Sequence, residues 1–300
     1  MCIRDSVDPS HLAGVDVFPL PRGSDTVAPP RLPTARRALI PRGTPVRLDI
    51  VMPAHDEEDR IGPVLEAYRR AIADPDTRFL VAMDGCSDAT PDIVDAQRRV
   101  DPRVVPLAFP RMGKGGVLAE AFRRADGDLV GFVDADGATP PSEFVALARA
   151  AASADGAIAS RRHPAAVLPG ARPAGRRVAS AGFATMIRGL FHLPFADTQC
   201  GAKVFRRDAL DRALPHLSSR GFLFDVDLLH VMDQLGFEVV EVPTVWTDRA
   251  GSKLALAKDA RRMGLAAVAL WLQRVATPVP STAPDVVVGT PTPEDTRVAA

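Results

Sequence analysis

The amino-acid sequence predicts an α/β fold with a doubly wound, mostly parallel sheet and helices on both of its faces. The first observation is that short apolar runs alternate with helical segments between residues 46 and 161. The second is that an acidic pair, Asp134 and Asp136, directly follows one of these runs. Strands that alternate with helices of this length favour parallel pairing with right-handed crossovers. Open sheets of this class bind their ligands at the carboxyl ends of the strands.

The first half of the chain supplies five predicted strands. Each is short and almost wholly apolar, which is typical of strands buried on both faces of a sheet. They are predicted at residues 46–52, 79–83, 104–109, 129–133 and 156–160. Helices are predicted between them at 61–73, from about 90 onward, at 115–125 and at 141–152. Apolar residues at helical spacing support the first helix, and Pro91 suits the first turn of the second.

The alternation weakens after about residue 162. Residues 178–191 are predicted to be helical, 224–235 to form a strongly amphipathic helix, and 239–245 to form a late strand. A long helix is predicted at 254–274, where basic residues mix with Leu265, Leu270 and Trp271. That mixture suits a helix that faces a membrane surface or a partner. A terminal helix packed on its own domain explains it equally well.

The two ends of the chain are predicted to lie outside the folded domain. Residues 1–45 are rich in proline and show little periodicity, which predicts a disordered arm. Residues 277–300 are rich in proline and threonine and are predicted to form a flexible tail. One folded domain at residues 46–276 remains.

The composition narrows the environment and the partners. Lys plus Arg and Asp plus Glu both number 37, so net charge gives no reason to expect nucleic acid as a partner. Cys2, Cys86 and Cys200 are too few and too scattered for a disulfide framework or a zinc cluster, which favours reduced thiols in the cytosol. No apolar run reaches the ~18–20 residues of a membrane-spanning helix, and charged residues interrupt any signal peptide. We therefore expect a cytoplasmic protein, with peripheral contact to the inner face of the cytoplasmic membrane as the alternative.

Asp134-Ala135-Asp136 delivers two carboxylates to the end of a predicted core strand. Hard oxygen ligands of this kind suit Mg²⁺ or Mn²⁺, which proteins hold with carboxylates and substrate phosphates. A solvated turn with an aspartate as helix N-cap is the plain alternative. The Asp-x-Asp triplet alone does not decide between them, because Asp225-Val226-Asp227 and two other segments also fit it.

The turn after the first predicted strand, residues 53–58, is acidic and contains no glycine. A dinucleotide-binding protein would place a Gly-rich turn there, so that pyrophosphate can approach a helix N-terminus. This turn is instead suited to ribose hydroxyls or to assisting a metal, although acidic residues that favour a helix N-terminus explain Glu57 and Glu58 almost as well. Lys114, in Gly113-Lys-Gly-Gly116, begins a predicted helix and can approach a phosphate or a base.

Six motifs occur in the order seen in family 2 glycosyltransferases, which have the GT-A fold. They are Pro53-Ala54 with Glu57-Glu58, Asp84-Gly85 with Ser87-Asp88 and Thr90, Lys114-Gly115-Gly116, Asp134-Ala-Asp-Gly-Ala-Thr139, Asp197-Thr-Gln-Cys-Gly-Ala-Lys203 and Phe224-Asp-Val-Asp-Leu-Leu229. With Glu241-Val-Pro243 and Gly251-Ser-Lys253, the chain resembles the branch that contains dolichyl-phosphate β-glucosyltransferase and dolichol-phosphate mannosyltransferase. The match covers residues 47–272. It implies a nucleotide-binding half at 46–161 and an acceptor half with the C-terminal helix at 162–276.

The resemblance also implies a role for each matching residue. Donor-binding roles fall on Pro53, Ala54, Glu57, Asp84, Lys114, Asp134, Ala135 and Asp136, and Asp134 and Asp136 would hold the Mg²⁺ or Mn²⁺. Acceptor- or sugar-binding roles fall on Ser160, Arg172, Arg176, Gln199 and Ser252. Catalytic roles fall on Asp225, Arg161 and Lys253. Asp225 and Asp227 cannot share a helix face, so at most one is expected to be catalytic. The arginines at 172–177 fit a solvated basic loop equally well.

The implied activity is inverting transfer of a hexose from a nucleotide-diphospho-sugar to a polyprenyl or dolichyl phosphate. UDP-glucose is the favoured donor and GDP-mannose the alternative. A phosphate acceptor is largely dianionic at neutral pH and needs cations more than a base, whereas a hydroxyl acceptor needs a carboxylate base such as Asp225. A soluble enzyme with a hydroxyl acceptor therefore stays open. So does a catalytically silent nucleotide-sugar-binding protein, because Met83 stands where the family usually has an acidic residue.

Overall fold

The computed structural model describes residues 46–169, 174–247 and 256–280. The predicted arm at 1–45 and most of the predicted tail, residues 281–300, lie outside the described residues. Arg172, Ser252 and Lys253 also lie outside them.

Strands and helices alternate through most of the described chain. The strands are β1 (Leu48–Ala54), β2 (Thr77–Asp84), β3 (Val104–Phe109), β4 (Leu129–Val133), β5 (Gly156–Ser160), β6 (Ala202–Arg206) and β7 (Val239–Pro243). The α-helices are α1 (Ile61–Ala71), α2 (Thr90–Val100), α3 (Lys114–Arg124), α4 (Pro141–Ala151), α5 (Ala174–Phe191), α6 (Arg207–Ala213), α7 (Phe224–Gln234) and α8 (Leu256–Ala276), with a 3-10 turn, η2, at Leu214–His216.

The predicted fold class is confirmed. Over the described residues the strands form one seven-stranded sheet in the order β3-β2-β1-β4-β6-β5-β7. β1 pairs in parallel with β2 and β4, β2 with β3, and β5 with β7. Strand β6 is antiparallel to both β4 and β5. The strands predicted at 104–109, 129–133 and 156–160 have the predicted bounds, whereas β6 and α6 were not predicted.

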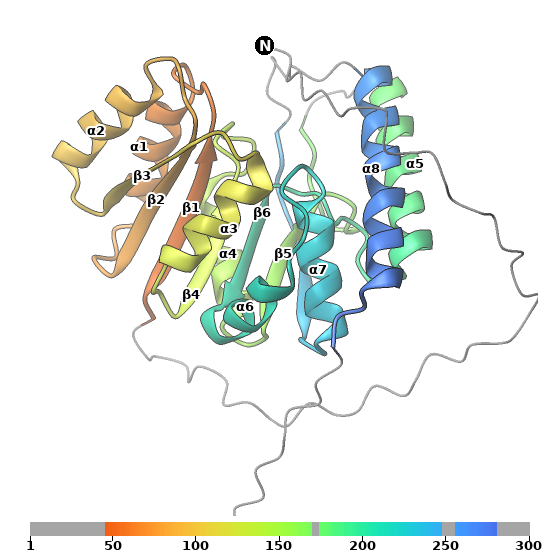
Figure 1. Ribbon diagram of the computed structural model, residues 1–300. Coiled ribbons are helices and arrows are strands. Elements are labelled where there is room, and N and C mark those ends of the chain that lie inside the picture. The colour runs from red at the N-terminus through yellow and green to blue at the C-terminus, as the bar shows by residue number, and fades with distance from the viewer. Residues whose placement is uncertain (1–45, 170–173, 248–255, 281–300) are drawn as a thin grey trace, which may run out of the picture. The chain divides into compact units, whose positions relative to one another are not determined.

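Helices cover both faces of the sheet (Figure 1). One core cluster contains buried residues of α3, α5, α6, α7 and α8, and α5 and α8 pack against each other. The second cluster lies on the opposite face and contains buried residues of α1, α2 and α4. Because the sheet is covered on both sides, its central strands are apolar at nearly every position.

Helix α7 is not amphipathic, which corrects the prediction for residues 224–235. Eight of its eleven residues are buried, including Asp225 and Asp227. The sequence suggested an exposed polar face because these aspartates alternate with apolar residues. Both carboxylates instead have basic partners inside the protein, which is what allows charged groups to be buried.

The buried carboxylate of Asp49, in β1, fixes the turn that leads into β4. It accepts hydrogen bonds from Arg78 Nε and Nη2 at 2.8 and 2.6 Å. It also accepts the backbone N–H groups of Asp126 and Gly127 at 2.8 and 2.9 Å. The start of β4 is thereby tied to β1 and β2, so the acidic residues that follow β4 emerge at a defined point of the sheet edge.

No helix among residues 46–169, 174–247 and 256–280 combines the length and the hydropathy that crossing a bilayer requires.

Candidate active site

Asp134 and Asp136 lie at the carboxyl end of β4, as predicted. Ala135 between them is buried, so the two carboxylates are displayed while the chain between them is anchored in the core. The Asp134 N–H donates to the carbonyl of Gly201 at 2.9 Å. Asp136 Oδ1 accepts the N–H of Ala138 at 2.9 Å. Both aspartates are partly exposed and therefore reachable by a ligand.

A row of alternating charges runs inward from Asp134. Lys114 Nζ lies 2.7 Å from Asp134 Oδ1 and 3.7 Å from Asp225 Oδ2. Asp225 Oδ1 accepts a hydrogen bond at 2.5 Å from Lys203 Nζ, and Lys203 is fully buried. Both ammonium groups also lie just over 5 Å from the centre of the Phe132 ring, where the ring face attracts a cation. We call Asp134, Lys114, Asp225 and Lys203 the charge row.

The charge row shifts the pKa values of its members. Burial alone would lower the pKa of Lys114, but the carboxylates of Asp134 and Asp225 outweigh it, so this pKa is raised. Burial alone would raise the pKa of Asp225, but the ammonium groups of Lys203 and Lys114 hold it below its ordinary value. Asp225 is therefore a carboxylate at neutral pH and a weak base.

Asp136 behaves in the opposite way to Asp225. Burial and the charge of Asp134 raise its pKa, and the N–H of Ala138 and the charge of Lys114 only partly offset them. Two carboxylates with too little positive charge between them provide a site that a divalent cation fits. Mg²⁺ or Mn²⁺ bound to Asp134 and Asp136 would supply a positive charge next to Lys114.

Gly201 allows Asp134 to take this position. A Cβ on Gly201 would lie 1.9 Å from Asp134 Oδ2 and 2.4 Å from its Cγ, so only glycine leaves room for the carboxylate. The same residue accepts the Asp134 N–H. Gly201 belongs to the segment 197–203 that was singled out by resemblance, but its role was not predicted.

The expected donor-side residues gather at the ends of β1 and β2. The Asp84 carboxylate accepts the N–H groups of Met112 at 2.6 Å and of Gly113 at 3.1 Å, so it orders the turn that precedes Lys114. Glu57 Oε2 lies 2.5 Å from Arg60 Nε, and the Glu57 N–H donates to Thr90 Oγ1. Pro53 is partly exposed and Ala54 is buried.

Met83 and Glu58 have roles in the scaffold. Met83 is buried in the core cluster on the face of the sheet that α1 and α4 cover, and Ala54 is its register partner on β1. Of the adjacent residues Met83 and Asp84, only Asp84 carries a carboxylate. Glu58 Oε2 accepts the N–H of Ala89, the residue at the start of α2. This contact fits the alternative given for Glu58 above, that an acidic residue is favoured at a helix N-terminus. The helix concerned is α2 and not α1.

Arg161 forms an ion pair with Asp197. Its Nε and Nη2 donate to the two carboxylate oxygens at 2.7 and 2.9 Å, and its backbone N–H donates to the same group. The guanidinium also lies over the ring of Trp246. Glu241 accepts the N–H groups of Ala196 and Asp197 and so holds the pair in place. Because this ion pair is bidentate, it holds the Arg161 guanidinium in one orientation, and Arg161 is not available as a free cation.

Two of the other expected acceptor-side residues, Ser160 and Gln199, lie within the described part of the chain. Ser160 is fully buried, and its Oγ accepts the N–H of Arg162 at 3.4 Å. Gln199 Nε2 donates to the carbonyl of Phe222 at 3.5 Å. Arg176 lies in α5, but its side chain is outside the described part of the chain, as are Arg172, Ser252 and Lys253.

Asp227 points away from the charge row. It pairs with Arg274 of α8 and accepts the backbone N–H groups of Ser218 and Ser219 at 2.7 and 2.8 Å. The expectation that Asp225 and Asp227 face different ways is confirmed, and Asp227 serves the scaffold.

The roles of Lys203 and Gly201 in the site were missed from the sequence, and so was the scaffold contact that Ser218-Ser219 makes with Asp227. Lys203 carried a signal, because a lysine followed by Val204-Phe205 is unusual unless an acidic partner is buried with it. Ser218-Ser219 carried none, because its role comes only from contact with Asp227.

Comparison with known proteins finds a matching family and similar proteins. Residues 49–214 match the family described as glycosyl transferase family 2. Glycosyltransferase AglD of Haloferax volcanii is 30% identical over 253 residues, which cover 82% of this chain and 40% of that protein. Dolichyl-phosphate beta-glucosyltransferase ALG5C of Trichomonas vaginalis is 33% identical over 224 residues, which cover 69% of this chain and 65% of that protein. The chain thus spans less than two thirds of the length of these two relatives.

A solved structure shares the fold. The crystal structure of glucosyl-3-phosphoglycerate synthase from Mycobacterium tuberculosis, in complex with Mn²⁺, uridine diphosphate and glucosyl-3-phosphoglycerate, superposes with a TM-score of 0.55. The alignment covers 78% of this chain and 81% of that one at 19% identity. At that identity the likeness concerns the fold alone.

The close approach at Gly201 gives a direct test of the site. We expect Gly201→Ala to remain folded but to push the Asp134 carboxylate away from Lys114. Mn²⁺ affinity should then fall by about 10-fold or more, the loss that is typical when the support of a metal ligand is disturbed. Titration followed by the electron paramagnetic resonance of free Mn²⁺ measures this.

Gly189→Ala in α5 is the matched control, because a Cβ there meets no atom within 4 Å. Unchanged Mn²⁺ affinity in folded Gly201→Ala would contradict the assignment of Asp134 as a ligand.

Proposed function

The chain belongs to glycosyl transferase family 2 and has the GT-A fold, and from this premise we propose that it transfers a hexose from a nucleotide-diphospho-sugar to a polyprenyl phosphate with inversion at the anomeric carbon. UDP-glucose is the favoured donor and GDP-mannose the alternative. The observation that carries the proposal is the charge row, which places Lys114 between Asp134 and Asp225. The dolichyl-phosphate acceptor in the name of the Trichomonas relative supports the acceptor class.

The donor side of the site is suited to a departing diphosphate. Breaking the bond between sugar and diphosphate places negative charge on the leaving nucleotide, and fixed positive charge stabilises it as it develops. Lys114 supplies one such charge, and its raised pKa keeps it protonated through the neutral range. A divalent cation held by Asp134 and Asp136 would supply Lewis-acid stabilisation at the same place.

The acceptor chemistry follows from the low basicity of Asp225. A hydroxyl acceptor needs a base whose pKa lies near the working pH. The pKa of Asp225 is lowered by two lysines, and its carboxylate is almost completely buried. A phosphate acceptor already carries its negative charge, since its second pKa is ~6. The geometry therefore favours the phosphate over the hydroxyl.

The cations that meet the acceptor phosphate are proposed to come mainly from the residues after β5. Nε and Nη2 of Arg161 both donate to Asp197, so Arg161 is proposed to form part of the wall of the acceptor site. Direct contact with the phosphate is proposed, by resemblance, for Arg172 and Arg176, whereas Lys253 is proposed to lie on a loop that closes over the donor diphosphate. Ser160, Gln199 and Ser252 complete the proposed acceptor and sugar contacts.

Helix α8 is proposed to bring the enzyme to the inner face of the cytoplasmic membrane, where a polyprenyl phosphate is embedded. Its apolar stripe consists of Leu265, Val268, Leu272 and Val275, all exposed and spaced so that they share one helix face. Arg261 and Arg262 are exposed near the start of this face. An apolar face flanked by arginines is the pattern of a helix that lies in the interface of an anionic bilayer.

The transfer reaction itself is the primary test. We expect purified protein with Mg²⁺ or Mn²⁺ to move radiolabelled glucose from UDP-glucose, or mannose from GDP-mannose, onto a short-chain polyprenyl phosphate, with a β-linked product. The matching polyprenol separates the two acceptor chemistries, because it presents a hydroxyl on the same chain. Product on the polyprenol alone would establish the hydroxyl acceptor. Metal-dependent UDP binding without any transfer, by folded protein, would establish the silent binding protein.

The pH dependence tests the assignment of the nucleophile. We expect kcat/KM to rise as pH increases through ~6, where the acceptor phosphate loses its second proton, and to stay level above it. Deprotonation of Asp225 is complete below that range because its pKa is lowered. A phosphonate analogue of the acceptor, which has a higher second pKa, should move the acid limb upward. An acid limb that does not move would belong to a group on the protein and would contradict the proposal.

The apolar stripe of α8 is tested with vesicles. We expect the protein to sediment with vesicles that contain anionic phospholipid, and the Leu265→Glu/Leu272→Glu variant to bind at least about tenfold more weakly, since burying each leucine contributes ~1.5 kcal/mol or more. Gln273→Glu, at an exposed position of the same helix, is the control for added charge. Equal binding of the double variant and the wild type would refute the membrane contact.

A further inference from the structure

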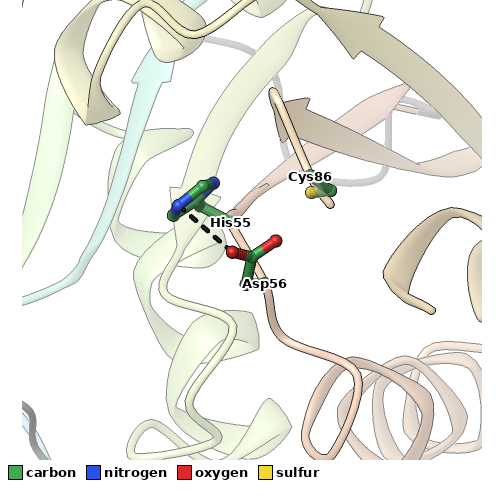
Figure 2. A group of neighbouring side chains, drawn as sticks. All are labelled: His55, Asp56 and Cys86. Carbon is green, nitrogen blue, oxygen red and sulfur yellow. Dashed lines mark ion pairs between the residues drawn. The ribbon is translucent and has the colours of Figure 1, made fainter. Parts of the chain in front are cut away.

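Three side chains beside the donor pocket have no part in the proposed transfer. His55 and Asp56 follow β1, and Cys86 follows β2, which pairs in parallel with β1. One ligand atom from each lies within 4.8 Å of the other two, and Figure 2 shows the three side chains as neighbours. We propose that His55, Asp56 and Cys86 bind one borderline-soft divalent cation of the Zn²⁺ type, at a site separate from Asp134 and Asp136.

The orientation of the imidazole is the first argument. His55 Nδ1 lies 2.8 Å from the backbone carbonyl oxygen of Asp84. A carbonyl oxygen can only accept, so Nδ1 carries the proton of the neutral ring and Nε2 carries the lone pair. Metal-binding histidines are typically oriented in this way, with the second ring nitrogen donating to a carbonyl or a carboxylate.

The group that Nε2 faces is the second argument. Nε2 lies 3.5 Å from Asp56 Oδ2 (Figure 2). When the ring is neutral, the Nε2 lone pair is directed at this carboxylate oxygen, and a metal cation between them would bind both; without the metal, a proton on Nε2 would take the same place. Two ligand atoms bound to the same tetrahedral Zn²⁺ at ~2.0–2.1 Å are ~3.3–3.4 Å apart, so this pair already has the required separation.

Asp56 is held in place by a costly backbone conformation. Its φ is 51°, in the left-handed region that residues other than glycine rarely adopt. The carboxylate accepts the N–H of Ser87 through Oδ1 at 2.8 Å, and the Ser87 hydroxyl lies within hydrogen-bonding distance. The same hydroxyl lies 3.3 Å from Oδ2, the oxygen that also faces His55. A strained residue whose side chain is fixed from two sides is typical of a ligand site.

Cys86 determines which cation is preferred. Its thiol is half-buried, and Sγ donates weakly to the carbonyl of Ala54 at 3.5 Å. Sulfur and imidazole ligands select Zn²⁺-type ions, whereas carboxylates alone select Mg²⁺ and Mn²⁺. Binding of the thiolate would replace the weak Sγ–H contact with Ala54. Three protein ligands then leave a fourth position for water or a ligand.

The site is open to solvent and lies next to the donor pocket. The side chains of His55 and Asp56 are 38% and 23% exposed, so an ion can enter directly. His55 is oriented by Asp84, the residue that orders the turn before Lys114. The scattered cysteines had argued against a zinc cluster. The proposed site uses a single cysteine with a histidine and an aspartate.

Cobalt provides a probe that reads the thiolate independently of transfer activity. We expect Co²⁺, added to the full-length reduced protein, to give a thiolate-to-metal charge-transfer band in the near ultraviolet that saturates at one ion per chain. Cys86→Ser should abolish the band, while Cys2→Ser should keep it. Zn²⁺ should displace Co²⁺ at stoichiometric amounts, and excess Mg²⁺ should not.

Two further variants separate the two metal sites. Asp56→Asn keeps the shape of the side chain and should weaken Co²⁺ binding by about tenfold or more. Asp134→Asn should leave the band unchanged, because it belongs to the other site. Circular dichroism confirms that each variant is folded. No band with the folded wild type, a band that survives in Cys86→Ser, or a band that is lost in Asp134→Asn would overturn the proposal.

Discussion

The pairing of Lys203 with Asp225 is the contact on which the rest of the site depends. Lys203 lies in β6, in the middle of the sheet, and is completely buried. A buried ammonium group is tolerated only if a carboxylate and further acceptors surround it, and here Asp225 and the carbonyl of Cys200 do so. Asp225 then attracts Lys114, and Lys114 reaches Asp134. One row of charges thus connects the antiparallel strand, helix α7, the start of α3 and the end of β4.

Helix α7 joins this row to the far side of the molecule through its second aspartate. Asp227 binds Arg274 of α8 and the N–H groups of Ser218 and Ser219. The next residue in that loop, Arg220, offers its carbonyl to the N–H of Gly116 in the first turn of α3. The helix proposed to lie on the membrane is therefore linked, through α7 and this loop, to the turn that carries Lys114. In the proposed function, acceptor delivery by α8 and donor binding at Lys114 would share these connected elements.

The sequence predicted the parts of the fold that depend on local pattern. Strand β4 was found because residues 129–133 are apolar on both faces, and its last residue located Asp134 and Asp136. Strand β6 was missed because Lys203 interrupts an apolar run, and its place between β4 and β5 depends on Asp225, 22 residues further along. Within the site, Lys114 was expected at a helix start and Asp134 at a strand end, but the contact between them was not predicted.

The engagement of Arg161 by Asp197 was not expected. Both residues were assigned separately, and only the distance between them shows that they neutralise each other. The role of Gly201 was missed for the same reason. Gly201 leaves room for the Asp134 carboxylate because it has no Cβ. Roles that come from a pair of residues far apart in sequence cannot be read from either one alone.

The balance of charge explains why this site would use a cation where a dinucleotide-binding fold uses a glycine-rich turn. Around the end of β4, the carboxylates of Asp134, Asp136 and Asp225 outnumber the ammonium groups of Lys114 and Lys203 by one. A diphosphate that approached these side chains alone would meet net repulsion. The pKa of Asp136 is raised first by burial and then by the charge of Asp134. A divalent cation reverses the local sign and turns the same carboxylates into ligands. In the proposed enzyme, the donor and the cation would then bind together. Lys114 is already held between two carboxylates and would not need to move.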